Sequence, residues 1–170
     1  MKRAIALLEK HNLLKIISDE LDINLEIPHI AYVEVKRPDS KAILFTNVVD
    51  RKNSKKFKEP VLMNVFCNED AVKLFIGDGD KIGSEIESLL KLKPPVTFSE
   101  KLSTLGKLFS LKNTIPKKIK GKGICQEVIK LGADAKLSDL PVIKTWEDDA
   151  GAFITMGQVY TQSLNGELKN

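Results

Sequence analysis

Two apolar segments, AILFT at Ala42–Thr46 and PVLMNVF at Pro60–Phe66, decide the fold class of this chain. Both consist largely of residues that fit a pleated, buried surface. Because neither segment contains a charged residue, both are predicted to be strands that are buried on their two faces. Such strands need helices packed against them, so the fold class depends on what the flanking sequence supplies.

The sequence on the N-terminal side supplies two predicted helices. Apolar residues recur at helical spacing in Arg3–His11 and again in Asp22–Val35. Asn24 is the predicted N-cap of the second helix, although Pro28 leaves the position of its first residue open. Between the helices, Leu13–Ile17 is a short apolar run and is predicted to be a strand or an extended connector.

The sequence on the C-terminal side supplies further helices. Asn68–Gly77 begins with a capping residue, continues with two acids that suit the positive end of the helix dipole, and ends on a glycine. A second helix is predicted to begin with Asp80 as its cap and to stop before Pro94, and a third to begin at Ser99. Two strands flanked by amphipathic helices predict a small α/β domain over residues 1–115.

The character of the sequence changes after residue 123. Ile124–Leu131 alternates between two sets of side chains, and Ala152–Gln162 is rich in Thr, Val, Ile, Phe and Tyr, so both are predicted to be strands. Asn165-Gly166 follows, a strong signal for a tight hairpin because both residue types tolerate positive φ. Residues 116–170 are therefore predicted to begin a second, β-rich domain.

The return strand of this hairpin would begin at Glu167, and the sequence stops at Asn170. An outgoing strand with so short a partner would present a bare edge, which folded proteins avoid. We therefore expect this chain to be the front part of a longer protein.

The composition is that of an ordinary soluble globular protein, with 42% apolar and 29% charged residues. No apolar run approaches the roughly 20 residues that cross a bilayer. Glu9 and Lys10 interrupt the apolar N-terminal segment and no signal-peptide cleavage site follows, so a cytoplasmic location is predicted. Cys67 and Cys125 lie far apart among apolar residues and are predicted to be buried free thiols.

Positive charge gathers in two segments, RKNSKKFK at Arg51–Lys58 and KNTIPKKIKGK at Lys112–Lys122. A surface for nucleic acid would combine such charge with stacking aromatic side chains. The first segment contains only Phe57 and the second contains no aromatic residue, which favours solvated loops. Nucleic-acid binding through the lysine clusters is kept as a remote alternative function.

Other polar residues give weaker signals. The acidic run at residues 147–149 could supply oxygen ligands to a cation, but three consecutive acids more often form a solvated loop. His11 and His29 have no Cys or His at ligand spacing and are expected at helix surfaces. Trp146 is the one Trp of the sequence, and its default role is packing.

Blocks along the whole chain resemble the UbiD-type decarboxylases. IALLEKHNLL (Ile5–Leu14) and DINLEI (Asp22–Ile27) are similar to the opening helix of that family and to the DxxLEI step that follows it. AILFTN (Ala42–Asn47) and PVLMNVFCNEDAVKLFIG (Pro60–Gly77) resemble its next two blocks. LPVIKTWEDDAGAFITMGQVYTQSLNGELKN (Leu140–Asn170) resembles the last block, and all occur in the family's order.

Two departures from the family pattern stand out. Asp149-Ala150-Gly151 occupies the place where the family more often has Asp-Gly-Gly, and Cys67 replaces a small residue before the helix cap. Neither changes the expected fold, while the altered loop is compatible with a subgroup that takes a different substrate.

The resemblance implies a fold and a reaction. In these enzymes a small α/β domain leads into a flavin-reductase-like split β-barrel. They add or remove the carboxylate of aromatic or α,β-unsaturated acids with prenylated FMN, whose phosphate is clamped by a divalent ion, typically Mn2+, and by K+. The implied partners are the carboxylic acid substrate, a flavin prenyltransferase that supplies the cofactor, and further copies in a homo-oligomer. A polyprenylated substrate would add peripheral membrane association, and nucleic acid is not among the implied partners.

The resemblance also assigns roles to individual residues. Asn170, directly after the Asn165-Gly166 turn, matches an asparagine whose amide oxygen binds the divalent ion at the cofactor phosphate. Leu168 would offer its backbone carbonyl to K+. Thr155 matches a position that lines the flavin in some members, with a threonine that merely fills the barrel wall as the alternative. The catalytic Arg and two Glu residues would lie beyond Asn170, so these 170 residues alone are expected to be inactive.

The predicted function is therefore the N-terminal part of a prenylated-FMN-dependent, non-oxidative carboxy-lyase in ubiquinone or menaquinone biosynthesis. The alternative is a non-catalytic flavin-binding or assembly module of the same fold. An Arg soon after Asn170 would favour the enzyme, and its absence would favour the module.

Overall fold

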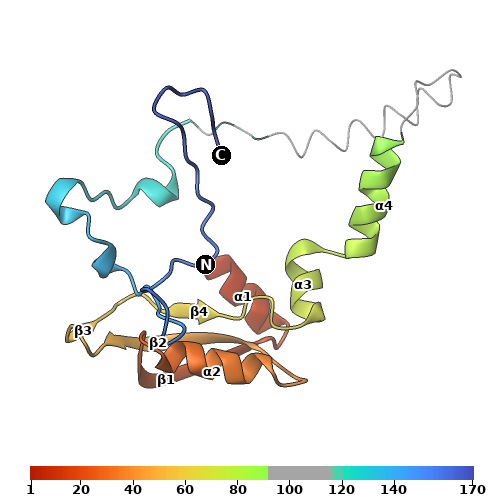
Figure 1. Cartoon of the computed structure of the whole chain (residues 1–170). Helices are drawn as coiled ribbons and strands as arrows, with labels where there is room; N and C mark the ends of the chain where they lie inside the picture. Colours follow the sequence, from red (N-terminus) through yellow and green to blue (C-terminus); the bar gives the residue numbers. More distant parts are fainter. Residues whose placement is uncertain (92–115, 117, 119) are drawn as a thin grey trace, which may run out of the picture. The chain divides into compact units, whose positions relative to one another are not determined.

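The computed structural model describes residues 1–91, 116, 118 and 120–170 (Figure 1). The chain forms two compact units, one of Met1–Val72 with Lys136–Asn170 and one of Lys73–Ala135. The first unit contains a mixed four-stranded sheet with its helices. The predicted boundary between residues 115 and 116 adjoins the part that is not described and stays a prediction.

The central strand of the sheet is β2 (Ala42–Asp50). β1 (Leu14–Asp22) runs parallel to it along one edge, while β4 (Val61–Met63) and β3 (Lys55–Lys56) run antiparallel along the other. The first four residues of β2 are buried, which confirms the predicted strand and its two covered faces. The small α/β domain with an open sheet is thus confirmed.

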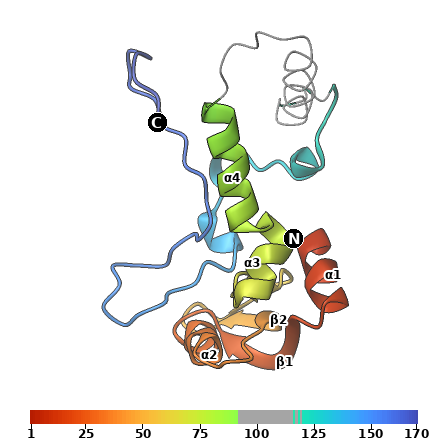
Figure 2. The ribbon, with the colours of Figure 1, turned by 90° about the vertical axis from the view of Figure 1, so that its right-hand side faces the viewer.

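Helix α2 (Glu26–Val35) makes the crossover that the parallel pair β1 and β2 requires. It lies along the sheet in both views (Figure 1 and Figure 2), with Ile27 fully buried against the strands. One apolar core forms between them. Its buried members are Ile23, Ile27, Ile43, Phe45, Val48, Phe57, Val61 and Ile143.

Helix α1 (Lys2–Lys10) confirms the helix that was predicted over Arg3–His11. Both views place it on the face of the sheet opposite to α2 (Figure 1 and Figure 2). Leu8 is fully buried there. Among the described helices, none combines the length and the apolarity needed to cross a bilayer.

The region between β1 and α2 differs from its prediction. β1 continues to Asp22, well beyond Leu13–Ile17, because an edge strand can carry charged residues on its solvent side. α2 begins at Glu26, and the residue at its N-cap is Leu25, with a positive φ of 70°, so the prediction of Asn24 as cap was wrong. Pro28 is tolerated because it lies in the first turn, where helical N–H groups have no partner.

The backbone of Lys144, far away in sequence, explains this unusual start. The Leu25 N–H donates to the Lys144 carbonyl at 3.1 Å, and the Lys144 N–H donates to the Ile23 carbonyl at 3.2 Å. Asn24 and Lys144 thereby form a parallel bridge. The C-terminal segment therefore holds Leu25 in a left-handed conformation that a leucine rarely adopts.

Helices α3 (Glu69–Ile76) and α4 (Gly79–Leu90) follow the sheet. The predicted cap of α3 is confirmed, since the Asn68 side chain accepts a bond from the Ala71 N–H at 2.9 Å, and Gly77 follows the helix at φ 98°. The cap of α4 is Asp78 rather than Asp80, because its carboxylate accepts from two backbone N–H groups of the first turn. The helix predicted from Ser99 lies outside the described residues.

The strands predicted at Ile124–Leu131 and Ala152–Gln162 were wrong for this structure. The first contains a 3-10 turn, η2 (Ile124–Gln126), and the second takes part only in isolated bridges, at Phe153 and at Gln162. A strand needs a neighbouring ladder to satisfy its backbone groups, and β-propensity alone does not supply one.

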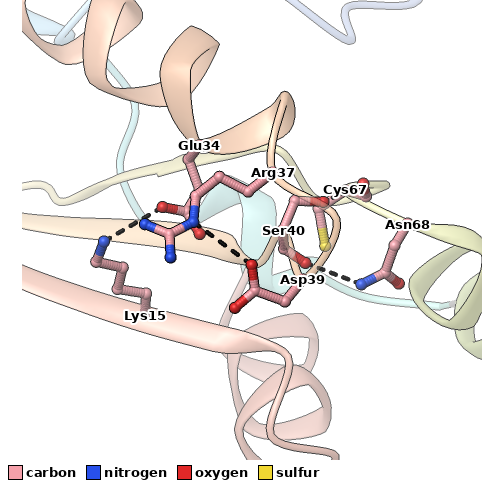
Figure 3. A network of polar contacts seen from close by, with 7 residues as sticks. All are labelled: Lys15, Glu34, Arg37, Asp39, Ser40, Cys67 and Asn68. Carbon is pink, nitrogen blue, oxygen red and sulfur yellow. Dashed lines mark hydrogen bonds and ion pairs between the residues drawn. The ribbon is translucent and has the colours of Figure 1, made fainter.

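A buried contact joins the α2–β2 connection to the start of α3 (Figure 3). The Ser40 hydroxyl donates to the Cys67 carbonyl at 2.6 Å, and the Asn68 side-chain amide donates to the Ser40 carbonyl at 2.8 Å. Cys67 is a buried free thiol, as predicted, and desolvation raises its pKa. The side chain of Cys125 lies outside the described part.

Two ion pairs lie beside this contact (Figure 3). The Lys15 ammonium on β1 is 3.2 Å from the buried Glu34 carboxylate, and Arg37 is 3.4 Å from Asp39. Glu34 lies in the last turn of α2, where the helix dipole disfavours negative charge. Lys15 offsets that penalty and fixes α2 to β1.

A second polar network closes the C-terminal ends of β1 and β2. The Asp22 carboxylate accepts from the N–H groups of Asn24 at 2.9 Å and Arg51 at 3.3 Å, and the Asp22 N–H donates to Glu26 at 2.9 Å. The Arg51 guanidinium pairs with Glu26. The Asp22 N–H, and then Arg51, lower the pKa of the Glu26 carboxyl.

We predict that Glu26→Gln lowers stability in a pH-dependent way. Because the pKa of Glu26 is lowered in the folded state, its contribution is present above the ordinary glutamate pKa and is lost as the pH falls through the folded value. The loss near neutral pH should be at most about 1 kcal/mol, since the pair with Arg51 is solvent-exposed. Urea unfolding at a series of pH values measures the difference in free energy of unfolding between Glu26→Gln and the unchanged protein, with Glu59→Gln as control. A difference that stays constant with pH would contradict the prediction.

We also predict that Ser40→Ala destabilises the fold by about 1–3 kcal/mol, because it leaves a buried carbonyl of Cys67 without its donor. Thr46→Val is the matched control, since it removes an exposed hydroxyl that donates to the Ile17 carbonyl. That change should cost no more than about 0.5 kcal/mol. Equal losses for the two variants, measured by denaturant unfolding, would show that burial of the Ser40 bond is unimportant.

Candidate functional site

A tight turn precedes the end of the chain, as the sequence predicted. The Gly166 N–H donates to the Ser163 carbonyl at 2.9 Å, and the Ser163 N–H donates to the Leu168 carbonyl at 3.0 Å. Gly166 has φ 75°, while Asn165 is not among the residues with positive φ. The turn therefore centres on Leu164 and Asn165, one residue before the predicted centre, with Gly166 supplying the left-handed step.

Side chains brace this turn. The Ser163 hydroxyl lies 2.6 Å from the Asn165 side-chain oxygen and accepts a bond from the Leu168 N–H at 3.0 Å. The Asn165 amide donates in turn to the Glu167 carboxylate at 2.6 Å. Serine and asparagine bond readily to nearby backbone, which is why they favour turns. The sequence drew attention to Asn165 and missed Ser163, because a lone serine carries no signal for such a role.

Asn170 lies directly after the turn, on the returning segment. Its N–H donates to the Thr161 carbonyl at 3.0 Å, so its backbone is fixed to the outgoing segment. Its side chain is exposed and has no hydrogen bond within the described residues. An amide oxygen of this kind is a suitable ligand for a hard divalent cation.

The Leu168 carbonyl has one bond from the Ser163 N–H and lies 3.4 Å from the Ser163 hydroxyl. That hydroxyl has a single proton, and the Asn165 oxygen at 2.6 Å is the better acceptor for it. The Leu168 carbonyl thus retains one lone pair. This suits the oxygen ligation that K+ requires, although no ion is needed to explain the turn.

Thr155 lies at a different place from the turn. It lines an open hollow of about 200 Å³ together with strand β4 and the crossing of Leu140–Ile143 with Phe153. Neither Leu168 nor Asn170 lines this hollow. The structure thus brings two of the three predicted site residues together in one turn and leaves Thr155 apart from them.

A larger hollow of about 490 Å³ lies at the same crossing. Apolar side chains dominate its lining, with Asp50 as the charged member. The turn η4 (Leu137–Asp139) borders it and is held by Lys55, whose ammonium contacts the Ser138 carbonyl at 2.6 Å and Asp139 at 3.0 Å. These contacts fix the C-terminal segment against the β2–β3 hairpin.

Within the described ranges, no three His, Cys, Asp or Glu residues are grouped as a metal site would need. In the acidic run at residues 147–149, Asp149 accepts a bond from the Trp146 N–H at 2.9 Å and so shapes its own loop. His29 is exposed on α2, as predicted, whereas His11 is exposed in the turn that directly follows α1. Trp146 departs from its expected packing role, because it is 55% exposed and touches Tyr32 edge-on.

Much of the charge of the basic segment Arg51–Lys58 is compensated within the chain. Arg51 pairs with Glu26, Lys55 with Asp139, and Lys56 with Glu20 at 3.5 Å. The pairs favour a structural role for this segment, while the absence of a nucleic-acid partner stays a prediction. Most of the second basic segment lies outside the described residues.

Two models of one protein family match this chain in order. The 3-octaprenyl-4-hydroxybenzoate carboxy-lyase N-terminal domain matches residues 5–90, and the Rift-related domain of the same enzyme matches residues 117–170. The first match covers the α/β unit with α3 and α4. The second match contains the turn, Asn170 and those residues of the C-terminal segment that line the two hollows.

Curated relatives extend over the same residues. Uncharacterised proteins from two strains of Helicobacter pylori are 42% and 41% identical over all of this chain, and one from Aquifex aeolicus is 36% identical over 96% of it. The chain spans 28% of the length of the two former proteins and 32% of the latter. The matches to both family domains show that this chain belongs to the UbiD family of carboxy-lyases.

Proposed function

We propose that this chain is the N-terminal part of a prenylated-FMN-dependent decarboxylase that acts on aromatic or α,β-unsaturated acids. The observation that carries the proposal is the match of residues 117–170 to the Rift-related domain, a range that contains the turn before Asn170. The match of residues 5–90 to the N-terminal domain of the same enzyme supports it.

The described residues suit a cofactor phosphate that is held through cations. Asn170 would give its amide oxygen to a divalent ion such as Mn2+, and Leu168 its remaining carbonyl lone pair to K+. Prenylated FMN, when bound, supplies the electron sink for the loss of carbon dioxide. The role of the chain's own residues is then to position these oxygens, through the braces from Ser163 and Asn165.

A split β-barrel is the fold that we propose around this site. Ile154, Met156, Val159 and Tyr160 are between 62% and 77% exposed in the segment that follows Phe153. Apolar side chains gathered in this way on one segment are covered in folded proteins, and further strands of a barrel would cover them. Thr155 would then line the flavin from the barrel wall.

The proposal includes a cellular setting. A cytoplasmic enzyme of ubiquinone or menaquinone biosynthesis would receive its cofactor from a flavin prenyltransferase and would form a homo-oligomer. A polyprenylated aromatic acid as substrate would bring it to the membrane surface. The family description refers to an octaprenylated hydroxybenzoate, which supports the substrate part of this setting.

We predict that Asn170→Ala, in the full-length protein, weakens Mn2+ binding by about tenfold or more and lowers carbon dioxide release in parallel. The loss follows because alanine removes the oxygen ligand without altering the turn. Asn170→Asp keeps an oxygen and should retain the ion, while Asn53→Ala is the control for the same change elsewhere. Metal titration and product assay provide the measurements. Unchanged Mn2+ affinity in Asn170→Ala would refute the metal role.

We predict that the 170-residue chain alone, with added prenylated FMN, releases no carbon dioxide from candidate acids. The full-length protein, expressed with the prenyltransferase, should release it. Turnover by the isolated chain would disprove the assignment of the catalytic residues to a later segment. A full-length protein that binds the cofactor but never turns over would instead establish the non-catalytic module.

A further inference from the structure

A third hollow, of about 360 Å³, opens between the start of α2 and the segment Thr145–Glu147. It exists because the bridge between Asn24 and Lys144 brings these two segments together. This hollow is separate from the proposed cofactor site, because its lining includes none of Thr155, Leu168 and Asn170. Its lining residues are Leu25, Glu26, Pro28, His29, Tyr32, Thr145, Trp146 and Glu147.

Two aromatic rings, one from each of these segments, line the hollow. The ring centroids of Tyr32 and Trp146 are 5.5 Å apart at an interplanar angle of 75°. Both side chains stay open to solvent, Tyr32 at 45% and Trp146 at 55%. The Lys36 ammonium lies 5.1 Å from the Tyr32 centroid, so Tyr32 already faces one cation. In the part of the chain that the structure describes, no cation lies over Trp146, whose ring is the stronger cation–π acceptor.

Acidic side chains lie at the same opening, and the Lys144 ammonium contacts the Glu147 backbone carbonyl there at 2.7 Å. Glu147 lines it and Asp148 is the next residue, and both are exposed. Neither carboxylate has an ion pair or a hydrogen bond within the described ranges. Glu26, also in the lining, is kept ionised by the Asp22 N–H and by Arg51. An open aromatic ring beside unpaired carboxylates is complementary to a cation with a flat, apolar face.

We propose that this hollow binds an arginine side chain that a partner protein presents. The planar guanidinium stacks on an indole ring while its edge donates to carboxylates, and it is less strongly hydrated than an ammonium ion. Leu25 and Pro28, together with the exposed Tyr32 and Trp146, give the hollow an apolar lining for the stem of that side chain. Tryptophan, tyrosine and arginine are the residues that dominate protein–protein contacts, which favours a polypeptide over a free small cation.

Trp146 reports on this site directly, because it is the one tryptophan in the sequence. Its fluorescence can be followed while a capped Gly-Arg-Gly peptide is titrated into the 170-residue chain at low salt. The matched peptide carries citrulline, which has the shape of arginine without its charge.

The expected result is a saturable change in Trp146 emission, with the arginine peptide binding about tenfold more tightly than the citrulline peptide. Added salt should weaken the binding of the arginine peptide, because the carboxylates are exposed and their charge is screened. Glu147→Gln and Tyr32→Leu should each reduce the affinity severalfold, whereas Glu9→Gln, with the same change of net charge on α1, should leave it intact. A lysine peptide should bind less tightly than the arginine peptide.

Three outcomes would overturn the proposal. Equal affinity for the arginine and citrulline peptides would exclude recognition of the guanidinium. An unaltered affinity in Glu147→Gln, with the fold confirmed by circular dichroism, would place the ligand elsewhere. An emission change that follows dilution of the protein alone, together with a dimer in sedimentation, would assign the hollow to a second copy of the chain.

Discussion

The parallel pairing of β1 with β2 is the constraint on which the rest of this structure depends. A parallel pair cannot be joined by a tight turn, so the chain must cross over the sheet, and α2 is that crossing. Packing of α2 on the sheet buries Ile27 beside Phe45 and forms the core. The same geometry brings the ends of β1 and β2 to one edge, where Asp22, Glu26 and Arg51 join them.

The C-terminal segment is held to this unit at only a few points. Ile143 enters the core, Lys144 bridges to Asn24, and Asp139 pairs with Lys55. Between these attachments the backbone remains irregular, and two hollows lie at the crossing of this segment with Phe153. The fixed points explain how residues distant in sequence come to share a lining with α2 and with β4. Apolar side chains of the same segment, Phe153 and Ile154 among them, remain at least half exposed.

Local signals in the sequence were sufficient for the α/β unit and insufficient for the segment after it. The buried run of β2, the Asn68 cap and the Gly166 step each depend on nearest neighbours, so they were predictable. The start of α2 depends on Lys144, more than a hundred residues later, and no local pattern predicts that contact. Ala152–Gln162 has the composition of a strand, but its pairing depends on partners that composition does not specify.

The candidate site shows the same division between local and distant causes. The turn at Ser163 is held by its own residues: the Ser163 hydroxyl, the Asn165 side chain and Gly166 fix its backbone. The Leu168 carbonyl and the Asn170 side chain are then both free to accept further bonds. Two oxygens two residues apart on a braced backbone can approach neighbouring cations without further ordering of that backbone, although the free Asn170 side chain must still be ordered. A cation site at this turn would need further ligands from other segments, because two neutral oxygens alone cannot hold a divalent ion against water.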